Sequence, residues 1–231
     1  MDRVALAAAI DQTLLRPTAG PSEAREWMMN SRDAGFASLC VPPFLVPHAS
    51  EILAGTATRV CSVCGFPLGY SLTETKAEEA RQLVRVGCQE VDMVLNVAAF
   101  LAGDVRGAHD DVRAVVDAVA SVSSEAIVKV ILETGYLTEE EIRSASRLCV
   151  EAGAHFVKTS TGFGPRGAST RDVRLMRGAV GPRVGVKASG GIRDLRTALE
   201  MLDAGADRIG TSSGLEILAA RDDLDRCEDD G

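Results

Sequence analysis

The chain has 231 residues, of which 46% are hydrophobic and 25% are charged, and its formal net charge at pH 7 is −8. A chain of this size can bury a large apolar core without metals or disulfides, and its negative charge argues against nucleic acid or a membrane surface as a partner. No apolar run approaches the roughly 18 residues of a membrane span, so we expect a cytoplasmic protein.

The first predicted strand is IDQTLL (10–15), and four later segments repeat one pattern, in which a glycine precedes a short apolar run. Such a glycine is typical of the residue that ends a helix, because it adopts a left-handed conformation without a Cβ penalty. Val/Ile-rich runs between the repeats predict further strands. The repeats are DAGFASLCV (33–41), RVGCQEVDMV (85–94), EAGAHFVKTS (151–160) and DAGADRIGTS (203–212), and the other strands are 59–66, 127–133 and 183–189.

Helix starts fall between these strands. Thr138 and Glu141 form a predicted capping box, and Asp194 is a predicted N-cap. Eight strands alternating with helices favour a single-domain (β/α)8 TIM barrel over residues 1–220, followed by an acidic C-terminal tail over 221–231. The alternative is a doubly wound open sheet, which usually carries a glycine fingerprint after its first strand, and none follows Leu15.

Polar residues interrupt five of the predicted strands. In a parallel barrel the helix-facing side is apolar, so polar strand residues are expected inside, near the C-terminal mouth. A buried ion network without chemistry is the alternative, and it stays open for Lys129 and Glu133, which could pair with each other. The alternation groups Asp11 with Thr13, Asp92 with Asn96, Lys129 with Glu133, Lys158 with Ser160, and Lys187 with Ser189.

Two of these lysines, Lys158 and Lys187, are expected as the last residues of adjacent strands, each followed by a small, glycine-rich turn. The turns SGGIRD (189–194) and GTSSG (210–214) follow predicted strands seven and eight, the usual phosphate subsite of this fold. Arg193 would add a positive charge there. The sequence therefore predicts an anion site beside the two lysines.

A lysine attacks a carbonyl only as the neutral amine, although a free lysine has a pKa near 10.4. A dry barrel interior and the nearby cation Lys187 would both favour the neutral form of Lys158, which is how a Schiff-base lysine is activated. Asp92 could move protons, directly or through a water. A Schiff-base lysine, a proton-transfer carboxylate and a neighbouring anion site together indicate an aldolase. With only three histidines and no metal-ligand spacing, we expect no catalytic metal and no other cofactor.

The cysteines fit the same interpretation, since most lie in apolar segments where cysteine behaves as a small hydrophobe. CSVC (Cys61 and Cys64) is a lone CxxC motif, and alternation puts its two sulfurs on opposite faces of a strand. We therefore expect reduced thiols rather than disulfides or a metal site.

At this point eight segments, in order, resemble the deoxyribose-phosphate aldolase family. The resemblance implies a (β/α)8 barrel that reversibly cleaves 2-deoxyribose 5-phosphate to acetaldehyde and glyceraldehyde 3-phosphate, and hence a part in deoxyribose phosphate catabolism. The segments are IDQTLLRP, GFASLCVPP, VCSVCGFPLG, EVDMVLN, KVILET, FVKTSTGFG, VGVKASGGIR and RIGTSSG.

The resemblance also implies roles for individual residues. It places the Schiff-base lysine at Lys158 and proton-transfer roles at Asp92 and Lys187. Substrate and phosphate contacts are implied for Gly162, Gly190, Gly191, Ser212 and Ser213, with Thr13 and Asp11 lining the pocket.

Some positions depart from the family's pattern. Gln12 and Arg16 stand where the familiar form has His and Lys, and Phe163 stands where some members carry a lysine near the phosphate. No tyrosine follows Tyr136, so we do not expect the proton transfer that a terminal tyrosine assists in some members.

Three other functions remain open from sequence. They are another Schiff-base aldolase acting on a phosphosugar, a non-covalent isomerase or epimerase using Asp92 and Lys187, and a barrel that only binds a phosphorylated metabolite. The expected partners are small molecules, a phosphorylated sugar and acetaldehyde. Barrels of this kind often self-associate, so a homodimer is possible, although no surface stripe identifies an interface.

Overall fold

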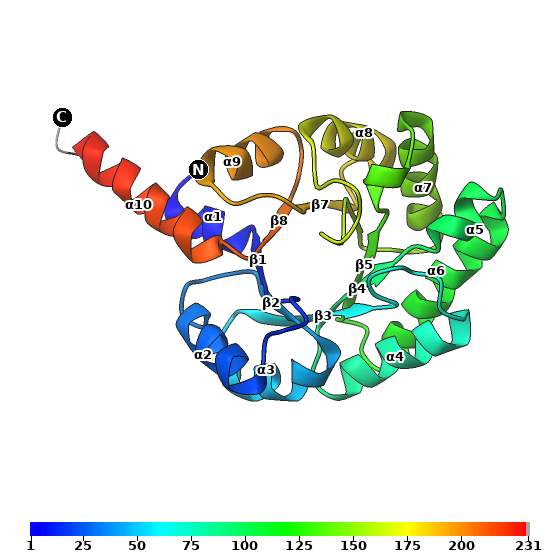
Figure 1. Ribbon diagram of the computed structural model, residues 1–231, viewed down its shortest axis with the longest axis horizontal. Helices are drawn as coiled ribbons and strands as arrows, with labels where there is room; N and C mark the ends of the chain where they lie inside the picture. Colours follow the sequence, from blue (N-terminus) through cyan, green and yellow to red (C-terminus); the bar gives the residue numbers. More distant parts are fainter. Residues whose placement is uncertain (230–231) are drawn as a thin grey trace.

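The computed structural model describes residues 1–229, in which eight parallel strands close into a barrel (Figure 1). Each strand pairs with the next in sequence, and β8 pairs with β1. The predicted (β/α)8 barrel is therefore confirmed, and the open sheet is excluded. The strands are β1 (Ile10–Thr13), β2 (Ser38–Val41), β3 (Arg59–Cys64), β4 (Glu90–Val94), β5 (Ile127–Ile131), β6 (Phe156–Lys158), β7 (Gly185–Ser189) and β8 (Arg208–Thr211).

Helices form a ring outside the strands (Figure 1). Two short 3₁₀ turns, η1 (Pro43–Leu45) and η2 (Thr134–Tyr136), follow β2 and β5. The α-helices are α1 (Arg3–Ala8), α2 (Pro21–Ser31), α3 (Val46–Ile52), α4 (Thr73–Arg85), α5 (Val97–Leu101), α6 (Val105–Ala120), α7 (Glu139–Glu151), α8 (Thr170–Val180), α9 (Leu195–Asp203) and α10 (Gly214–Asp229).

The four repeated glycines end helices as predicted. Gly35, Gly87, Gly153 and Gly205 have φ angles of +83°, +106°, +89° and +109°, a region that side chains with a Cβ rarely adopt. Each one turns the chain from a helix into the next strand, so the repeat read from sequence is the helix-to-strand unit of the barrel.

The predicted helix starts are also confirmed. Thr138 Oγ1 accepts a hydrogen bond from the backbone of Glu141, whose side chain accepts from the backbone N–H of Thr138 at 2.7 Å. At the start of α9, Asp194 accepts from the backbone N–H of Thr197 at 2.8 Å.

The strands are buried on both sides, with different chemistry on each side. On β4, Val91 and Met93 belong to the apolar core between sheet and helices, whereas Glu90 and Asp92 are buried on the alternating face. Five of the ionisable side chains predicted from period two therefore meet inside the barrel, namely Asp11, Asp92, Lys129, Lys158 and Lys187.

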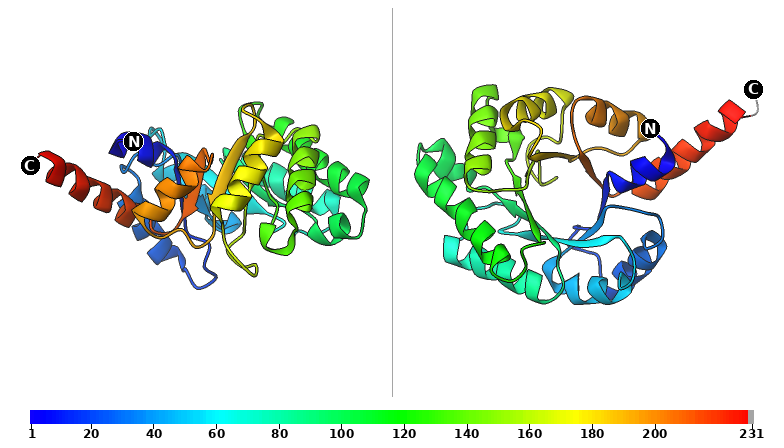
Figure 2. Two further views of the ribbon diagram at one scale, coloured as in Figure 1. Left: turned by 90° about the horizontal axis from the view of Figure 1, so that it is seen from above. Right: turned by 180° about the vertical axis from the view of Figure 1, so that it is seen from behind.

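The last helix, α10, continues past the ring of helices and projects away from the barrel (Figure 2). It lies beside α1, and Arg3 Nε donates to Asp222 Oδ2 at 3.2 Å. The segment assigned to an acidic tail is thus helical as far as Asp229, and residues 230–231 lie outside the described residues.

Within residues 1–229, none of the helices combines the length and the apolar character needed to cross a membrane.

Candidate active site

Asp92 lies at the centre of a buried charge cluster inside the barrel. Its Oδ1 accepts a hydrogen bond from Lys129 Nζ at 2.8 Å. Its Oδ2 accepts from Lys158 Nζ at 2.8 Å and from Lys187 Nζ at 2.7 Å. One carboxylate thus binds three amines from β5, β6 and β7.

A second layer lies toward the N-terminal ends of the strands. Asp11 Oδ2 is 2.7 Å from Lys187 Nζ and 3.3 Å from Lys129 Nζ, and Lys129 Nζ is 2.6 Å from Glu90 Oε2. Arg208 on β8 closes the network by contacting the carboxylates of both Asp11 and Glu90. The complete cluster contains three carboxylates, three amines and one guanidinium group.

The charges in the cluster stabilise one another. Burial alone would raise the pKa of Asp92, but the three amines hold that pKa well below its ordinary value. Burial alone would lower the pKa values of Lys129 and Lys187, but Asp11 and Asp92 raise both above the ordinary lysine value. Asp92 is therefore a carboxylate, and Lys129 and Lys187 are ammonium ions.

Lys158 occupies a different position in the cluster. It is the last residue of β6, as predicted, and it lines a cavity at the barrel mouth. Lys187 is opposite Lys158 in the register but lies in the middle of β7, not at the strand end that we predicted. Because β7 continues to Ser189, Lys187 lies deeper, and it is fully buried.

The sequence contains four lysines, and all four are buried. Three belong to the cluster, and Lys76 forms a separate pair with Asp111 at 2.6 Å. Only Lys158 lies on the wall of the mouth cavity. An aldehyde entering the cavity therefore meets one lysine amine.

The cavity has a volume of about 570 Å³, within the range of small-molecule sites. Trp27 of α2 and Phe163 lie on its wall. Beside the predicted Schiff-base residue Lys158, five of the seven residues predicted to contact the substrate or its phosphate line it, namely Thr13, Gly162, Gly190, Gly191 and Ser212.

The other two predicted contacts lie elsewhere. Asp11 is fully buried beneath the cavity, as part of the charge cluster. Ser213 lies outside the residues that form the wall, where its backbone N–H donates to Thr211 Oγ1 at 2.9 Å.

The loops after β7 and β8 form one side of this cavity. Gly190 and Gly191 have φ angles of +93° and +81°, and a Cβ on Gly190 would lie 2.9 Å from the Cα of Gly167. Only glycine fits that close approach. The exposed Arg193 also lies on the wall, and α9 and α10 begin next to these loops. Backbone N–H groups, helix N-termini and a guanidinium group are suited to an anion.

Three predicted partnerships on the strands are wrong, because Asn96, Glu133 and Ser160 all lie beyond the ends of their strands. Asn96 lies beyond β4 and caps α5. Ser160 lies beyond β6. Glu133 lies beyond β5 with a φ of +53°, and its carboxylate accepts hydrogen bonds from Thr161, not from Lys129.

Two members of the cluster, Glu90 and Arg208, were missed from sequence. Glu90 precedes Asp92 by two residues and so shares its face of the strand, which was the available signal. Arg208 is the first residue of β8. From sequence alone, an arginine at this position is equally consistent with a solvent-exposed strand end.

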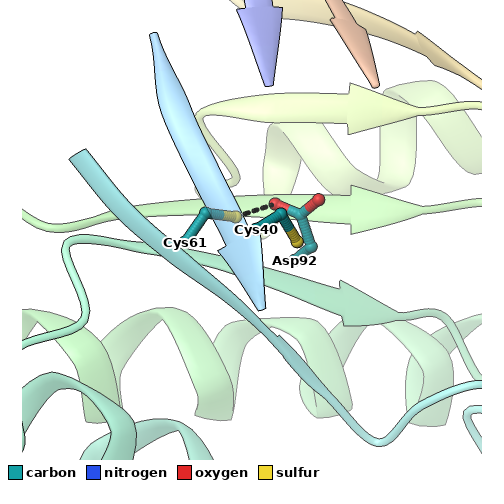
Figure 3. A group of neighbouring side chains, drawn as sticks. All are labelled: Cys40, Cys61 and Asp92. Carbon is teal, nitrogen blue, oxygen red and sulfur yellow. Dashed lines mark hydrogen bonds between the residues drawn. The ribbon is translucent and has the colours of Figure 1, made fainter. Parts of the chain in front are cut away.

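Two thiols border the cluster (Figure 3). Cys61 Sγ donates to Asp92 Oδ1 at 3.3 Å, and the Cys40 thiol lies on the neighbouring strand β2. Together with Asp92 they offer three ligand atoms within 4.8 Å of one another. A metal ion there would have to displace ammonium groups from Asp92. Burial also raises the pKa of Cys61, which opposes thiolate formation.

Cys64 of the CxxC motif points away from this site and donates to the backbone carbonyl of Lys76 at 3.1 Å. The two sulfurs thus lie on opposite faces of β3, as predicted.

Comparisons with known proteins agree on one family. The sequence model described as "DeoC/LacD family aldolase" matches residues 6–220. A deoxyribose-phosphate aldolase of Brevibacillus brevis is 51% identical over 209 residues, which cover 90% of this chain and 93% of the relative. A deoxyribose-phosphate aldolase 1 of Bacillus licheniformis is 50% identical, with coverage of 92% and 94%.

A solved structure of the tetrameric deoxyribose phosphate aldolase of Aeropyrum pernix superimposes with a TM-score of 0.87. It is 34% identical to this chain, and the match covers 95% of this chain and 92% of the other.

Proposed function

Because the chain belongs to the DeoC/LacD family of aldolases, we propose that it reversibly cleaves 2-deoxyribose 5-phosphate to acetaldehyde and glyceraldehyde 3-phosphate. The observation that carries the proposal is the position of Lys158, an amine on the wall of a cavity that is also lined by the glycine-rich loops after β7 and β8. The names of the relatives at about half identity support this substrate.

The reaction begins with the open-chain sugar, whose aldehyde carbon C1 is attacked by the lone pair of Lys158 Nζ. The carbinolamine then takes up a proton at its hydroxyl group and loses water, which leaves a protonated imine. Lys187 and Asp92, whose polar atoms lie 2.7 Å apart next to Lys158, are the groups that donate and accept these protons.

The protonated imine is an electron sink for the cleavage step. A base removes the proton from the C3 hydroxyl, the C2–C3 bond breaks, and its electron pair becomes the enamine double bond between C1 and C2. C3 becomes the aldehyde carbon of glyceraldehyde 3-phosphate. Protonation at C2 and hydrolysis of the imine then release acetaldehyde and regenerate the amine.

The charges in the cluster support a neutral Lys158. Asp11, Glu90 and Asp92 are opposed by Arg208 and the three lysines. Uncompensated buried charge is costly, so the cluster is balanced when one amine gives up its proton. Lys158 is the amine on the cavity wall, and it makes a single contact with a carboxylate, whereas Lys187 contacts two and Lys129 contacts three.

The phosphate is held at the opposite end of the substrate. Its proposed ligands are the backbone N–H groups of the loops after β7 and β8, with Ser212 and Arg193. This arrangement needs no metal ion, so we propose a metal-independent reaction. The family pattern's phosphate lysine is absent, since Phe163 stands at that position with its ring 5.5 Å from Phe66.

We also propose a cytoplasmic homodimer. The tetramer of the Aeropyrum pernix relative supports self-association, and the buried, free thiols of Cys40, Cys61, Cys64, Cys88 and Cys149 support a reducing compartment. Sedimentation velocity tests the assembly, and a monomer at micromolar concentration would contradict it.

The assay that tests the function follows acetaldehyde release from 2-deoxyribose 5-phosphate, with and without a chelator. We expect turnover in both cases, and none from Lys158→Met. Turnover by Lys158→Met would contradict the covalent route. Release of an isomerised phosphosugar with no acetaldehyde would support the non-covalent isomerase instead.

A further inference from the structure

We infer that Glu90 and Arg208, at the end of the barrel opposite the cavity, are positioning residues that set how many protons the catalytic cluster holds. Neither residue lines the cavity, and each is the first residue of its strand. This inference rests on the proposed function, because it concerns the charge state that makes Lys158 a nucleophile.

The contacts of Arg208 connect the two layers of the cluster. Its Nη1 contacts Asp11, which in turn lies 2.7 Å from Lys187 Nζ. Its Nη2 is 3.4 Å from Glu90 Oε1, and the other oxygen of Glu90 is 2.6 Å from Lys129 Nζ. A change of charge at Glu90 therefore reaches Asp92 through Lys129, and a change at Arg208 reaches Asp92 through Asp11 and Lys187. Asp92 in turn binds Lys158.

Arg208 is suited to this task because a guanidinium group keeps its proton at every pH at which proteins function. It is the one member of the cluster whose positive charge is permanent. Its side chain is 17% exposed, and the guanidinium carbon lies 5.8 Å from the centre of the Phe156 ring. The charge is therefore mostly shielded from solvent and acts over a longer range than a surface charge would.

Glu90 contributes a charge of the opposite sign to the cluster. It is fully buried and contributes one of the three negative charges that hold the ammonium ions in place. Arg59 also approaches Glu90, at 3.6 Å, but its side chain is 46% exposed, and water screens its charge. Removing Glu90 would leave four cationic side chains against two carboxylates, and removing Arg208 would leave three amines against three carboxylates.

Ionisable groups from every other strand of the barrel face the cluster that contains Lys158. These groups are Asp11 (β1), Cys40 (β2), Cys61 (β3), Glu90 and Asp92 (β4), Lys129 (β5), Lys187 (β7) and Arg208 (β8). Glu90 and Arg208 can be changed without altering a group in contact with Lys158 or Lys187. The same is true of Lys129 and the two thiols.

The two residues therefore give opposite predictions for one measurement, the pH dependence of imine trapping by borohydride with acetaldehyde. Arg208→Gln removes a positive charge from the cluster, which favours the protonated amine. The pH at which the trapping rate rises, the rising limb of the profile, should therefore move to higher pH. Glu90→Gln removes a negative charge, so the rising limb should move to lower pH. We expect each shift to be about one pH unit, the lower end for a nearby charge.

The double variant, Glu90→Gln with Arg208→Gln, distinguishes charge from packing. It restores the balance of the cluster, so its limb returns to the wild-type position even though two buried side chains have changed. A merely structural role predicts that both single variants lose amplitude without opposite shifts, and that the double variant is worse than either.

Arg59→Gln is the matched control, which removes an exposed cation from the same carboxylate and is expected to leave the limb in place. Arg208→Lys retains the charge and should also retain the limb. If Arg208→Gln fails to fold, as judged by circular dichroism, Glu90→Gln is a sufficient test. A rising limb that moves to higher pH in Glu90→Gln, or that does not move, would overturn the inference. A wild-type enzyme that is not trapped at Lys158 would instead overturn the proposed function.

Discussion

Lys158 and Lys187 are opposite each other in the register of β6 and β7, and both Nζ atoms bind Oδ2 of Asp92, at 2.8 and 2.7 Å. Two amines on one carboxylate oxygen cannot both be protonated as favourably as one. The deeper amine, Lys187, also contacts Asp11 and retains its proton, because burial, which would lower its pKa, is outweighed by Asp11 and Asp92. This asymmetry supports the proposed roles of Lys158 as the nucleophile and Lys187 as the acid.

Lys187→Leu tests the asymmetry. Removing the ammonium group deletes both a proton donor and a positive charge next to Lys158, so kcat should fall by roughly 100-fold or more. The limb of the trapping rate should also move to higher pH. Steady-state kinetics between pH 5 and 10 measure the first effect, and borohydride trapping over the same pH range measures the second. A wild-type rate with a wild-type trapping profile would show that Lys187 has neither role.

Asp92→Asn removes the carboxylate shared by the three amines. We expect kcat to fall by at least about 100-fold, since proton transfer is lost, and the free energy of unfolding in urea to fall by about 3–5 kcal/mol, as for broken buried pairs.

The matched control for Asp92→Asn is Asp111→Asn, which breaks the buried pair with Lys76 outside the cavity. The control should lose stability and retain kcat. Equal losses of activity in the two variants would mean that Asp92 acts only through the fold.

Ser212→Ala tests the phosphate site. The hydroxyl group lies on the wall of the cavity beside the loop after β7, so its loss should raise the KM for 2-deoxyribose 5-phosphate several-fold. The KM for unphosphorylated 2-deoxyribose is the internal control and should stay the same. A parallel increase for both sugars would place the phosphate elsewhere.

The ordinary pKa of aspartate, about 3.9, is the unfolded reference for the pH dependence of stability. The amines hold the pKa of Asp92 below that value in the folded protein, and the cations around Asp11 do the same for its pKa although burial opposes them in both cases. The folded state therefore binds fewer protons than the unfolded state in acid. The stability from these carboxylates is complete above about pH 4 and is lost as the pH falls further.

The buried ammonium ions set the upper pH limit of this stability. Their pKa values are raised, so their contribution is complete below about pH 10 and is lost at higher pH. Urea unfolding of Lys158→Met, which lacks the one amine proposed to be neutral, should therefore show a plateau between the two limits. A steady decline from pH 8 to pH 5 would contradict the ion pairing.

Local residue patterns were enough to predict the barrel. The glycines at 35, 87, 153 and 205 mark the helix-to-strand turns because few other residues adopt their φ angles. The alternation on β4 placed Asp92 inside, and the glycine-rich loops predicted to bind an anion lie on the wall of the cavity after β7 and β8.

Strand ends were less predictable, because they are set by the closure of the barrel and not by local propensity. Glu133 continues the alternation of Lys129 in the sequence, but the chain leaves the sheet after Ile131 and its side chain turns to Thr161. The carboxylate partners of Lys129 are Asp11, Glu90 and Asp92, and the register between β4 and β5 places Lys129 opposite Asp92.

The most direct test of the account is reduction of the enzyme with borohydride in the presence of acetaldehyde, followed by peptide mapping. The account predicts one ethyl group on Lys158, and trypsin, blocked at that residue, should then yield the uncut peptide 148–166. Because the other three lysines are fully buried, the exposed N-terminus is the internal control for non-specific reaction. Cleavage at an unmodified Lys158 in an enzyme that still releases acetaldehyde would contradict the account.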